Sequence, residues 1–501
     1  MHIIKGLYRN IVTLLYSNIY VYCGLCACVY LLFYFSLHKA PIFAFIFALL
    51  PLILMGITLV LSKPYYLFIL FFTLNYFVMT FDRYVPNKKP GMIMLGFSIA
   101  FLLFVLVYSL FNKIEWKRVR TPFLYLWIVW MIYLIIQLFR RDVIFEAWAI
   151  NIGTYAFYPI CIAIFLPLLF YRFKDLKLFL FLWSIFIIIA TLKGYYQNYF
   201  GFDSRELQWL IREGGARTHF LRTGIRYFSI FTDAANYGTS NGFSLVVYAI
   251  AAFFVKKKWS KYYFLFIAML SLYGMLISGT RTATAIPFVG LTCFIVLSKH
   301  IKTIISGTII VAAAFIFLNY TTIGADNRYI RRMRTSFDSN DASLVLRQQN
   351  QAIIKTYMVH HPFGVGLGLS AGQALRWVEK SDIPDIPPDS WLVMVWTETG
   401  IVGLTIYMIM NALMYIWGAY IIVFKIKNRE LGGILIALYC GSLGLFVASY
   451  GNAILGFPNG IISYMAMVYV FIGPRLDKEL FEEDNVALES QKKLENARHP
   501  A

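Results

Sequence analysis

Charged residues are scarce in this chain, and acidic residues are the scarcest of them. Only 14% of the 501 residues are charged, and 25 Asp and Glu stand against 45 Lys and Arg. Soluble domains are about a quarter charged and about half apolar, whereas 60% of this chain is hydrophobic. So little charge excludes an ordinary soluble domain. We therefore expect an all-α polytopic membrane protein.

Cysteine is also rare, with six residues that all fall inside apolar segments. The spacing of Cys23, Cys26 and Cys28 is similar to half of a metal site, but no second cluster of Cys and His accompanies it. The sequence therefore predicts no metal site, no cofactor and no disulfide framework.

A signal-peptide cleavage site is missing as well. Lys5 and Arg9 precede a long apolar segment that no small-residue site follows, so we interpret this segment as an uncleaved first span. Apolar runs of sufficient length indicate about fourteen transmembrane helices, with a range of about 12–14. They lie near 17–37, 41–61, 65–81, 91–111, 121–139, 147–170, 177–194, 237–255, 262–280, 282–298, 303–319, 392–424, 431–450 and 453–473.

Lysine and arginine gather in alternate connections between these spans. The positive-inside rule places such connections in the cytoplasm, and only the loop around Arg83 is an exception. Because topology explains most of the net charge of +20, we expect contact with membrane lipids and no nucleic-acid partner. The cytoplasmic connections lie near 113–120, 172–177, 256–261, 299–302 and 425–429.

Two long polar loops fall on the opposite, outer side, and connections of this length are usually functional or disordered. They divide the chain into six segments. These are the N-terminal helices (1–196), an Arg-rich outer loop (197–236), the central helices (237–320), a large outer loop (321–390), the C-terminal helices (391–473) and a cytoplasmic tail (474–501).

The positive charge of the outer loops comes from arginine. No lysine lies between Lys193 and Lys256, although five arginines do, and five more arginines precede Lys355 in the second loop. A planar guanidinium binds phosphate oxygens in bidentate fashion, which an ammonium does not. The bias favours a phosphate-bearing ligand on the outer side. Alternatively, the arginines order the loops by pairing with carboxylates such as Asp203 and Glu206.

Four arginines stand close to predicted membrane entries. Arg281, in SGTRTATAI, directly precedes a span and needs an anionic partner, unless it only reaches lipid headgroups. Arg222 and Arg226 precede YFSIFTDAANYG, where they either flank a cavity or belong to a turn capped by Asp233. Arg347 lies near the start of a helical stretch.

That stretch ends in HHPFGVGLG, because proline does not continue a helix. The glycine-rich turn could approach a ligand closely. His360 and His361 are candidate bases, although a pair of histidines beside a proline more often marks a helix terminus. Asp382 and Asp385 are a candidate metal pair, but the neighbouring prolines favour a turn.

Two acids lie at a membrane edge in PPDSWLVMVWTETGIVGL. Asp389 and Glu398 are costly there unless they cap, pair or react. On a regular helix, nine residues at about 100° each would place them on opposite faces, which disfavours an acid/base pair. We expect Glu398 to anchor the helix or to pair with an arginine or a ligand.

These motifs together resemble the O-antigen ligase and polymerase superfamily of bacterial membrane glycosyltransferases. In DSWLVMVWTETGIVGL, Glu398, Gly400, Gly403 and Leu404 match a Glu-x-Gly-x-x-Gly-Leu signature in register, and Asp389 stands where ligases typically have histidine. HPFGVGLG, SGTRTA and RYFSIFTDAANYG are similar to further motifs of the family. The resemblance covers residues 215–405 approximately.

The resemblance implies a GT-C-like enzyme of the bacterial inner membrane whose active site faces the periplasm. Its donor would be a glycan on a polyprenyl diphosphate such as undecaprenyl diphosphate, and the transfer would be metal-independent and inverting. We assign Arg281 and Arg226 to the diphosphate, with Arg222 and Arg347 in support. Asp389 would accept the proton of the acceptor hydroxyl.

The aspartate in place of histidine favours the polymerase branch. The predicted function is therefore an O-antigen or surface-polysaccharide polymerase, with a chain-length regulator protein as a candidate partner. The alternative is an O-antigen ligase of lipopolysaccharide assembly that transfers glycan to lipid A-core. A lipid-linked oligosaccharide flippase is the alternative of another class, but transporters usually have internal repeats and short loops.

Overall fold

The computed structural model describes residues 65–84, 90–141, 143–221, 224–298, 301–334, 342–370, 377, 386, 388–456 and 458–498. The first two predicted spans, at 17–37 and 41–61, lie outside these residues. The chain divides into two units, 1–69 and 70–501. The account that follows concerns the second unit.

The described residues are almost entirely helical. The elements up to residue 200 are α4 (Tyr65–Phe77), η1 (Val78–Thr80), α5 (Phe81–Tyr84), α6 (Pro90–Phe111), η2 (Trp116–Val119), α7 (Pro122–Ile136), η3 (Gln137–Phe139), α8 (Phe145–Ile152), η4 (Gly153–Phe157), α9 (Tyr158–Leu169) and α10 (Phe173–Phe200). They are followed by α11 (Ser204–Arg212), α12 (Ala216–His219), β1 (Phe220–Leu221), β2 (Gly224–Ile225), α13 (Ala234–Ala251), α14 (Lys258–Ser278), α15 (Arg281–Leu297), α16 (Ile301–Tyr320), α17 (Arg328–Arg334), α18 (Ala342–Met358), α19 (Trp391–Phe424), α20 (Arg429–Ala448) and α21 (Asn459–Arg498). β1 and β2 pair as a short antiparallel hairpin.

Each predicted span within the described residues coincides with a helix or with consecutive helical segments. Among the described residues, seven helical segments are long and apolar enough to cross a membrane, and three shorter apolar helices accompany them. The expectation of an all-α, multi-pass membrane protein is therefore confirmed, whereas the total of fourteen spans stays a prediction.

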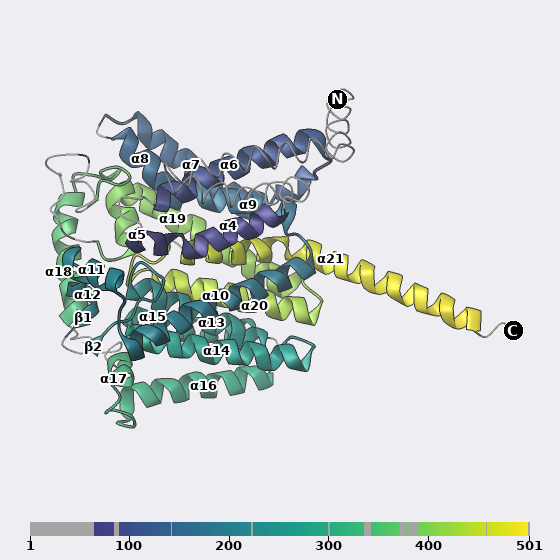
Figure 1. Cartoon of the computed structure of the whole chain (residues 1–501). Coiled ribbons are helices and arrows are strands. Elements are labelled where there is room, and N and C mark those ends of the chain that lie inside the picture. Colours follow the sequence, from purple (N-terminus) through teal and green to yellow (C-terminus); the bar gives the residue numbers. More distant parts are fainter. Residues whose placement is uncertain are drawn as a thin grey trace, which may run out of the picture. The chain divides into compact units, whose positions relative to one another are not determined.

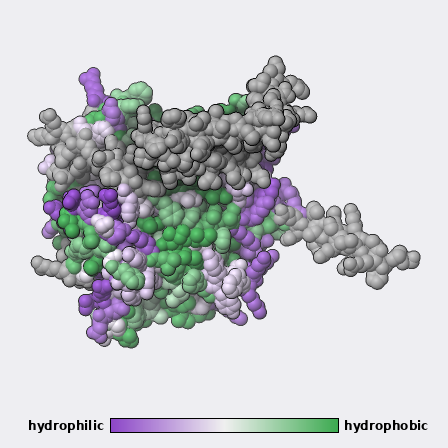
Figure 2. Space-filling view, viewed as in Figure 1, coloured by the Kyte–Doolittle hydropathy of each residue, from purple (hydrophilic) through white to green (hydrophobic). Residues whose placement is uncertain are grey.

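The long helices of the second unit run side by side, and the elements of the two long loops gather at one end of them (Figure 1). This end, with α11, α12, the hairpin, α17 and α18, is called the loop end below. On the face shown in Figure 2, hydrophobic residues cover the middle and hydrophilic residues gather toward the two ends. This distribution is what a membrane-embedded bundle requires, because charged side chains are costly in hydrocarbon.

Polar side chains begin several helices at the places where the chain enters the bundle. Asp233 accepts hydrogen bonds from the backbone N–H of Ala235 at 2.7 Å and of Asn236 at 2.9 Å, and so caps α13. The hydroxyl of Ser390 accepts a weaker bond from Val393 at the start of α19. Such caps satisfy N–H groups that have no partner within the helix, so the predicted capping role of Asp233 is confirmed.

Helix α13 is the centre of the bundle, where it packs against α14, α15 and α20. Its buried surface carries small and polar side chains. Ser244 donates to Ser271 of α14 at 2.9 Å, and Gly274 of α14 lies against Asn241. Small residues and interhelical hydrogen bonds are the usual means of close packing between membrane helices. This packing holds the loop-end termini of α13, α14 and α15 next to one another.

Arg83, the exception to the positive-inside pattern, is a buried structural residue. Its guanidinium donates to the backbone carbonyls of Ser229 at 3.3 Å and Thr232 at 2.7 Å, and also to that of Phe231. It lies 4.2 Å from the ring centroid of Phe228. Arg83 therefore fixes the segment that leads the first long loop back into α13.

In the first long loop, two acidic side chains pair with a lysine and not with arginines. Lys193 of α10 lies 2.9 Å from the carboxylate of Asp203 and 3.0 Å from that of Glu206. The suggestion that loop arginines pair with these two carboxylates is therefore not supported. Asp338 and Asp341, two other candidate partners, lie outside the described residues.

Candidate functional site

Arg226 lies directly after the hairpin and is held at the start of α15. It donates from Nη2 to the hydroxyl of Thr280 at 2.9 Å and from Nη1 to the carbonyl of Thr218 at 3.2 Å. Thr280 in turn donates to the carbonyl of Ala234 at 2.7 Å. The Nε of Arg226 is buried and makes no hydrogen bond within the described residues. One polar edge of this guanidinium therefore remains available to another group.

Arg347, on α18, is tied to the same helix start from the other side. Its Nη2 donates to the side-chain oxygen of Asn452 at 3.2 Å, and the amide nitrogen of Asn452 donates to the hydroxyl of Thr282. Asn452 lies in the connection between α20 and α21. The two residues that flank Arg281 in the sequence, Thr280 and Thr282, thus connect Arg226 and Arg347 to one place.

The pKa of Arg226 is affected by the charges of two other predicted site residues. Burial lowers the pKa of Arg226, the charge of Asp233 opposes this, and the charges of Arg281 and Arg347 lower the pKa further. Arg281 is half-buried and is the first residue of α15. Because the positive end of a helix dipole adds to the guanidinium charges, this place favours an anion with several negative charges.

Arg332 joins this cluster, although no sequence pattern distinguishes it from the other loop arginines. Arg281 and Arg332 line one closely packed crevice, together with Thr280 and Thr284, and this crevice has no room for a water molecule. Gly279 is so close to Arg332 that an added Cβ would lie 3.1 Å from the Cδ of the arginine. The sequence signal was only an Arg-rich run, in which Arg331 and Arg332 look alike; packing separates them.

Asp389 is the exposed residue before the cap of α19, and its backbone is in the left-handed region with φ 48°. Aspartate tolerates this conformation better than most residues. Partial burial raises the pKa of Asp389 above its ordinary value, and the charge of Arg347 opposes the rise. The arginine cluster therefore extends its influence to the predicted base through Arg347.

Glu398 occupies a different environment, deep in α19 and fully buried. Its carboxylate accepts a hydrogen bond from the hydroxyl of Ser370 at 2.6 Å. The backbone of the glycine-rich turn lies directly against it, since Gly366 donates to the carbonyl of Glu398 at 3.0 Å. This position favours the anchoring alternative for Glu398 over its predicted place in substrate binding.

The glycine-rich turn approaches a helix backbone, not an open cavity. Val365 donates to the carbonyl of Thr397 at 2.9 Å, and Val402 donates to that of Pro362 at 3.3 Å. Gly400, with φ 72°, breaks the helical conformation of α19 at this point. A Cβ there would lie 2.1 Å from the carbonyl oxygen of Pro362. Asp389 lies before the cap of α19, so the helical spacing from Asp389 to Glu398 does not apply; α19 is also interrupted at Gly400, just after Glu398.

The remaining predicted residues are placed only in part. Arg222, Asp382 and Asp385 lie outside the described residues. His360 is exposed and His361 is half-buried just beyond the last turn of α18, which agrees with a helix terminus. Within the part of the chain that the structure describes, no three His, Cys, Asp or Glu side chains are grouped so that they could hold a metal ion.

The comparison with known families concerns the segment that carries most of this site. The sequence model of the family "O-Antigen ligase" matches residues 264–408, which include Arg281, Arg347, Asp389 and Glu398. The match supports the resemblance to the O-antigen ligase and polymerase superfamily, whose members act in surface-polysaccharide assembly. No curated protein matches the chain.

Proposed function

We propose, on the premise of this superfamily, that the chain is a glycosyltransferase that polymerises polyprenyl-diphosphate-linked glycan repeats. The reaction would take place on the outer, periplasmic face of a bacterial inner membrane. The observation that carries the proposal is the convergence of Arg226 and Arg347 on the residues that flank Arg281. A cluster of guanidinium groups at a helix start is suited to a diphosphate, because a diphosphate carries several anionic oxygens.

The donor diphosphate would bind to Arg226, Arg281 and Arg347, and Arg222 is a further candidate for the same role. The bond that breaks joins the anomeric carbon to the diphosphate oxygen, so negative charge develops on the leaving group. Fixed guanidinium groups stabilise this charge without reorganisation during the reaction. In this role the arginines lower the barrier to departure, and polyprenyl diphosphate is the product that remains bound to them.

Asp389 would accept the proton as the acceptor hydroxyl attacks the anomeric carbon from the opposite side. The new glycosidic bond forms as the old bond breaks, so the anomeric configuration inverts. A raised pKa makes Asp389 a better base than an ordinary surface aspartate. Glu398 would act indirectly, because its bond to Ser370 supports the position of α19.

The choice of polymerase rests on Asp389, which stands where ligases of the superfamily typically have histidine. A ligase would use the same donor but would transfer the glycan to lipid A-core. The two functions therefore differ in the acceptor, not in the arginine cluster. A polymerase would have a chain-length regulator protein as a candidate partner in the same membrane.

Deletion of the gene in the bacterium that encodes it separates these functions. Gels of the surface glycan should show lipid A-core with single repeats if the chain is a polymerase. Loss of all glycan from lipid A-core, with long chains still lipid-linked, would instead identify a ligase. Retention of the wild-type ladder would contradict both functions.

Complementation of the deletion tests the site. Asp389→Asn should lower the rate of repeat transfer by about 10²–10⁴-fold, which is the usual contribution of a general base. Asp326→Asn is the matched control, because Asp326 is an exposed acid of the same long loop. Equal ladders from the two variants at equal protein levels would rule out Asp389 as the base.

A further inference from the structure

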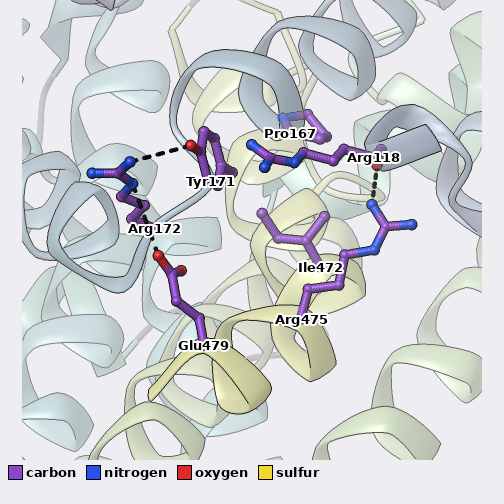
Figure 3. Close-up of a pocket in the computed structure, with 7 residues that line it drawn as sticks. All are labelled: Arg118, Pro167, Tyr171, Arg172, Ile472, Arg475 and Glu479. Atoms are coloured by element: carbon purple, nitrogen blue, oxygen red, sulfur yellow. Dashed lines mark hydrogen bonds and ion pairs between the residues drawn. The ribbon is translucent and has the colours of Figure 1, made fainter. Parts of the chain in front are cut away.

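A second cluster of arginines lies at the end of the bundle opposite the loop end. It surrounds the short connection between α9 and α10, and α10 runs from there to the loop end. A pocket of about 300 Å³ lies at this place, a size at the lower limit of small-molecule sites. Figure 3 shows the residues that line it. Its lining residues are Arg118, Pro167, Tyr171, Arg172, Ile472, Arg475 and Glu479.

Tyr171 joins two of the three arginines. The guanidinium carbon of Arg118 lies 3.6 Å from the centroid of the Tyr171 ring. Arg172 donates from Nη2 to the phenolic oxygen at 3.4 Å. Desolvation raises the pKa of Tyr171, but the hydrogen bonds and charges of Arg118 and Arg172 outweigh it and leave the pKa below its ordinary value. Both guanidinium groups are thus held at one wall of the pocket.

Arg475 comes from α21 and is held by backbone carbonyls. It donates to the carbonyl of Lys117 at 3.1 Å, to that of Arg120 at 3.4 Å and also to that of Arg118. Carbonyl groups orient a guanidinium without neutralising it. Burial lowers the pKa of Arg475, and the charge of Arg118 lowers it further. The positive charges of this cluster therefore repel one another in the absence of an anion.

The acids near the pocket compensate little of this charge. Glu479, the carboxylate in the lining, lies 3.8 Å from the Nε of Arg172. Glu115 lies 2.9 Å from the Nε of Arg118, but 70% of its side chain is exposed. Exposed ion pairs of this kind contribute about 0–1 kcal/mol. Arg118 and Arg172 thus each have one carboxylate partner, whereas Arg475 is bonded to backbone carbonyls, so a small excess of positive charge remains around the cavity.

Two residues of the lining are apolar, and Figure 3 shows Pro167 beside Arg118 and Ile472 beside Arg475. Pro167 lies in the last turns of α9, and Ile472 lies in the part of α21 that was predicted to span the membrane. The pocket therefore combines guanidinium groups with apolar side chains near the ends of membrane helices. A phospholipid combines the complementary groups, a negatively charged phosphate and apolar acyl chains.

We propose that this pocket binds the phosphate group of an anionic phospholipid, with the arginines on the phosphate and the acyl chains along Pro167 and Ile472. Arginines that only extend toward the headgroups of surrounding lipids would do so individually, without a shared cavity. Here they come from three segments distant in sequence and share one cavity. Bound lipid would join α21 to the connections before α7 and α10, so the site would stabilise this end of the bundle.

Thermal unfolding of the purified full-length protein in a mild detergent tests the proposal. Phosphatidylglycerol and phosphatidylcholine with identical acyl chains are titrated separately, and glycerol phosphate and inorganic phosphate are titrated as soluble sources of the same group. Phosphatidylglycerol should raise the melting temperature at lower concentration than the other three. An equal response to phosphatidylcholine, or an equal response to inorganic phosphate, would overturn a lipid headgroup site.

Charge variants give changes of opposite sign. Arg172→Gln should raise the half-saturating concentration of phosphatidylglycerol about fivefold, which corresponds to one charge near a membrane surface. Glu479→Gln should lower it, because the carboxylate of the lining is removed. Lys174→Gln is the control, since Lys174 is exposed at the same end and does not line the pocket. If Arg172→Gln and Glu479→Gln both behave like the control, the arginine pocket is not the binding site.

Discussion

Arg226 donates a hydrogen bond to the hydroxyl of Thr280 at 2.9 Å, and this bond joins two segments that are 54 residues apart. Thr280 directly precedes Arg281, so the bond places one arginine of the first long loop beside the start of α15. The position of the Arg226 side chain depends on that hydroxyl. Within the described residues, the guanidinium donates one other hydrogen bond, to the backbone carbonyl of Thr218.

Removal of this hydroxyl should weaken the site. In Thr280→Val, the Nη2 of Arg226 loses its acceptor, and an unsatisfied buried polar group costs about 1–3 kcal/mol. We expect a loss of about tenfold in repeat transfer at unchanged protein level, measured from glycan ladders. Thr405→Val is the control, because the hydroxyl of Thr405 is exposed and donates within its own helix, to the carbonyl of Ile401 at 2.8 Å. Equal losses in both variants would mean that the bond to Arg226 is unimportant.

The two neighbouring arginines of α17 should differ in effect. Arg332 lines the crevice with Arg281, whereas Arg331 is exposed. Arg332→Ala should reduce transfer at low donor concentration, because a charge near the diphosphate is lost, and Arg331→Ala should retain wild-type transfer. The measurement is the donor dependence of transfer in membranes. A defect of the same size in both variants would point to the net charge of the loop and not to Arg332.

The pH dependence of transfer should respond to Arg347. A base must be deprotonated, so activity should fall as pH falls through the pKa of Asp389, which lies above its ordinary value. The charge of Arg347 lowers this pKa. Arg347→Ala should therefore raise the pKa and move the acid limb of the pH–rate profile to higher pH. Arg331→Ala should leave the limb in place. An unmoved limb in Arg347→Ala would show that Asp389 does not titrate in the rate.

The interruption of α19 should tolerate only glycine. Gly400 has φ 72°, and a Cβ there would meet the backbone of Pro362. Gly400→Ala should lower the amount of folded protein and abolish most activity, because the turn that packs on Glu398 would be displaced. Gly432→Ala, in α20, is the control, since its Cβ would have its nearest neighbour at 3.4 Å and alanine favours a helix. Folding and activity are read from detergent-stable protein and glycan ladders.

The first long loop should loosen under acid conditions because of His219. Burial lowers the pKa of His219 to about 4. Its Nε2 accepts a hydrogen bond from the N–H of Ala234 at 3.3 Å, and its Nδ1 faces the carbonyl of Gly215 at 2.8 Å. Protonation of Nε2 would place a donor against a donor. The neutral side chain therefore stabilises the loop fully above pH 6.5 or so, and up to about 3 kcal/mol is lost as pH falls toward 4.

Hydrogen exchange of the loop measures this effect. Protection of the segment around His219 should decrease between pH 7 and pH 4.5 after correction for the intrinsic rate. His219→Gln cannot titrate, and its amide oxygen is in reach of the same N–H, so its protection should be less dependent on pH. An identical pH dependence in wild type and variant would assign the change to another group.

The sequence determined the membrane character of the protein and the positions of its helices. Apolar runs are local, so each predicted span in the described residues coincides with a helix. Capping is local as well, and the role of Asp233 was readable from its place before α13. The arginine bias of the long loops is a property of composition, and it predicts a phosphate-bearing ligand.

Only the tertiary structure decided which arginines come together. Arg226, Arg281 and Arg347 belong to separate segments, and contacts across such distances depend on packing that no local pattern encodes. The same reason applies to Arg83, whose partners lie about 150 residues further on. It also separates Asp389 from Glu398: Asp389 precedes the cap of α19 and is exposed, whereas Glu398 lies within α19 and is buried against Ser370.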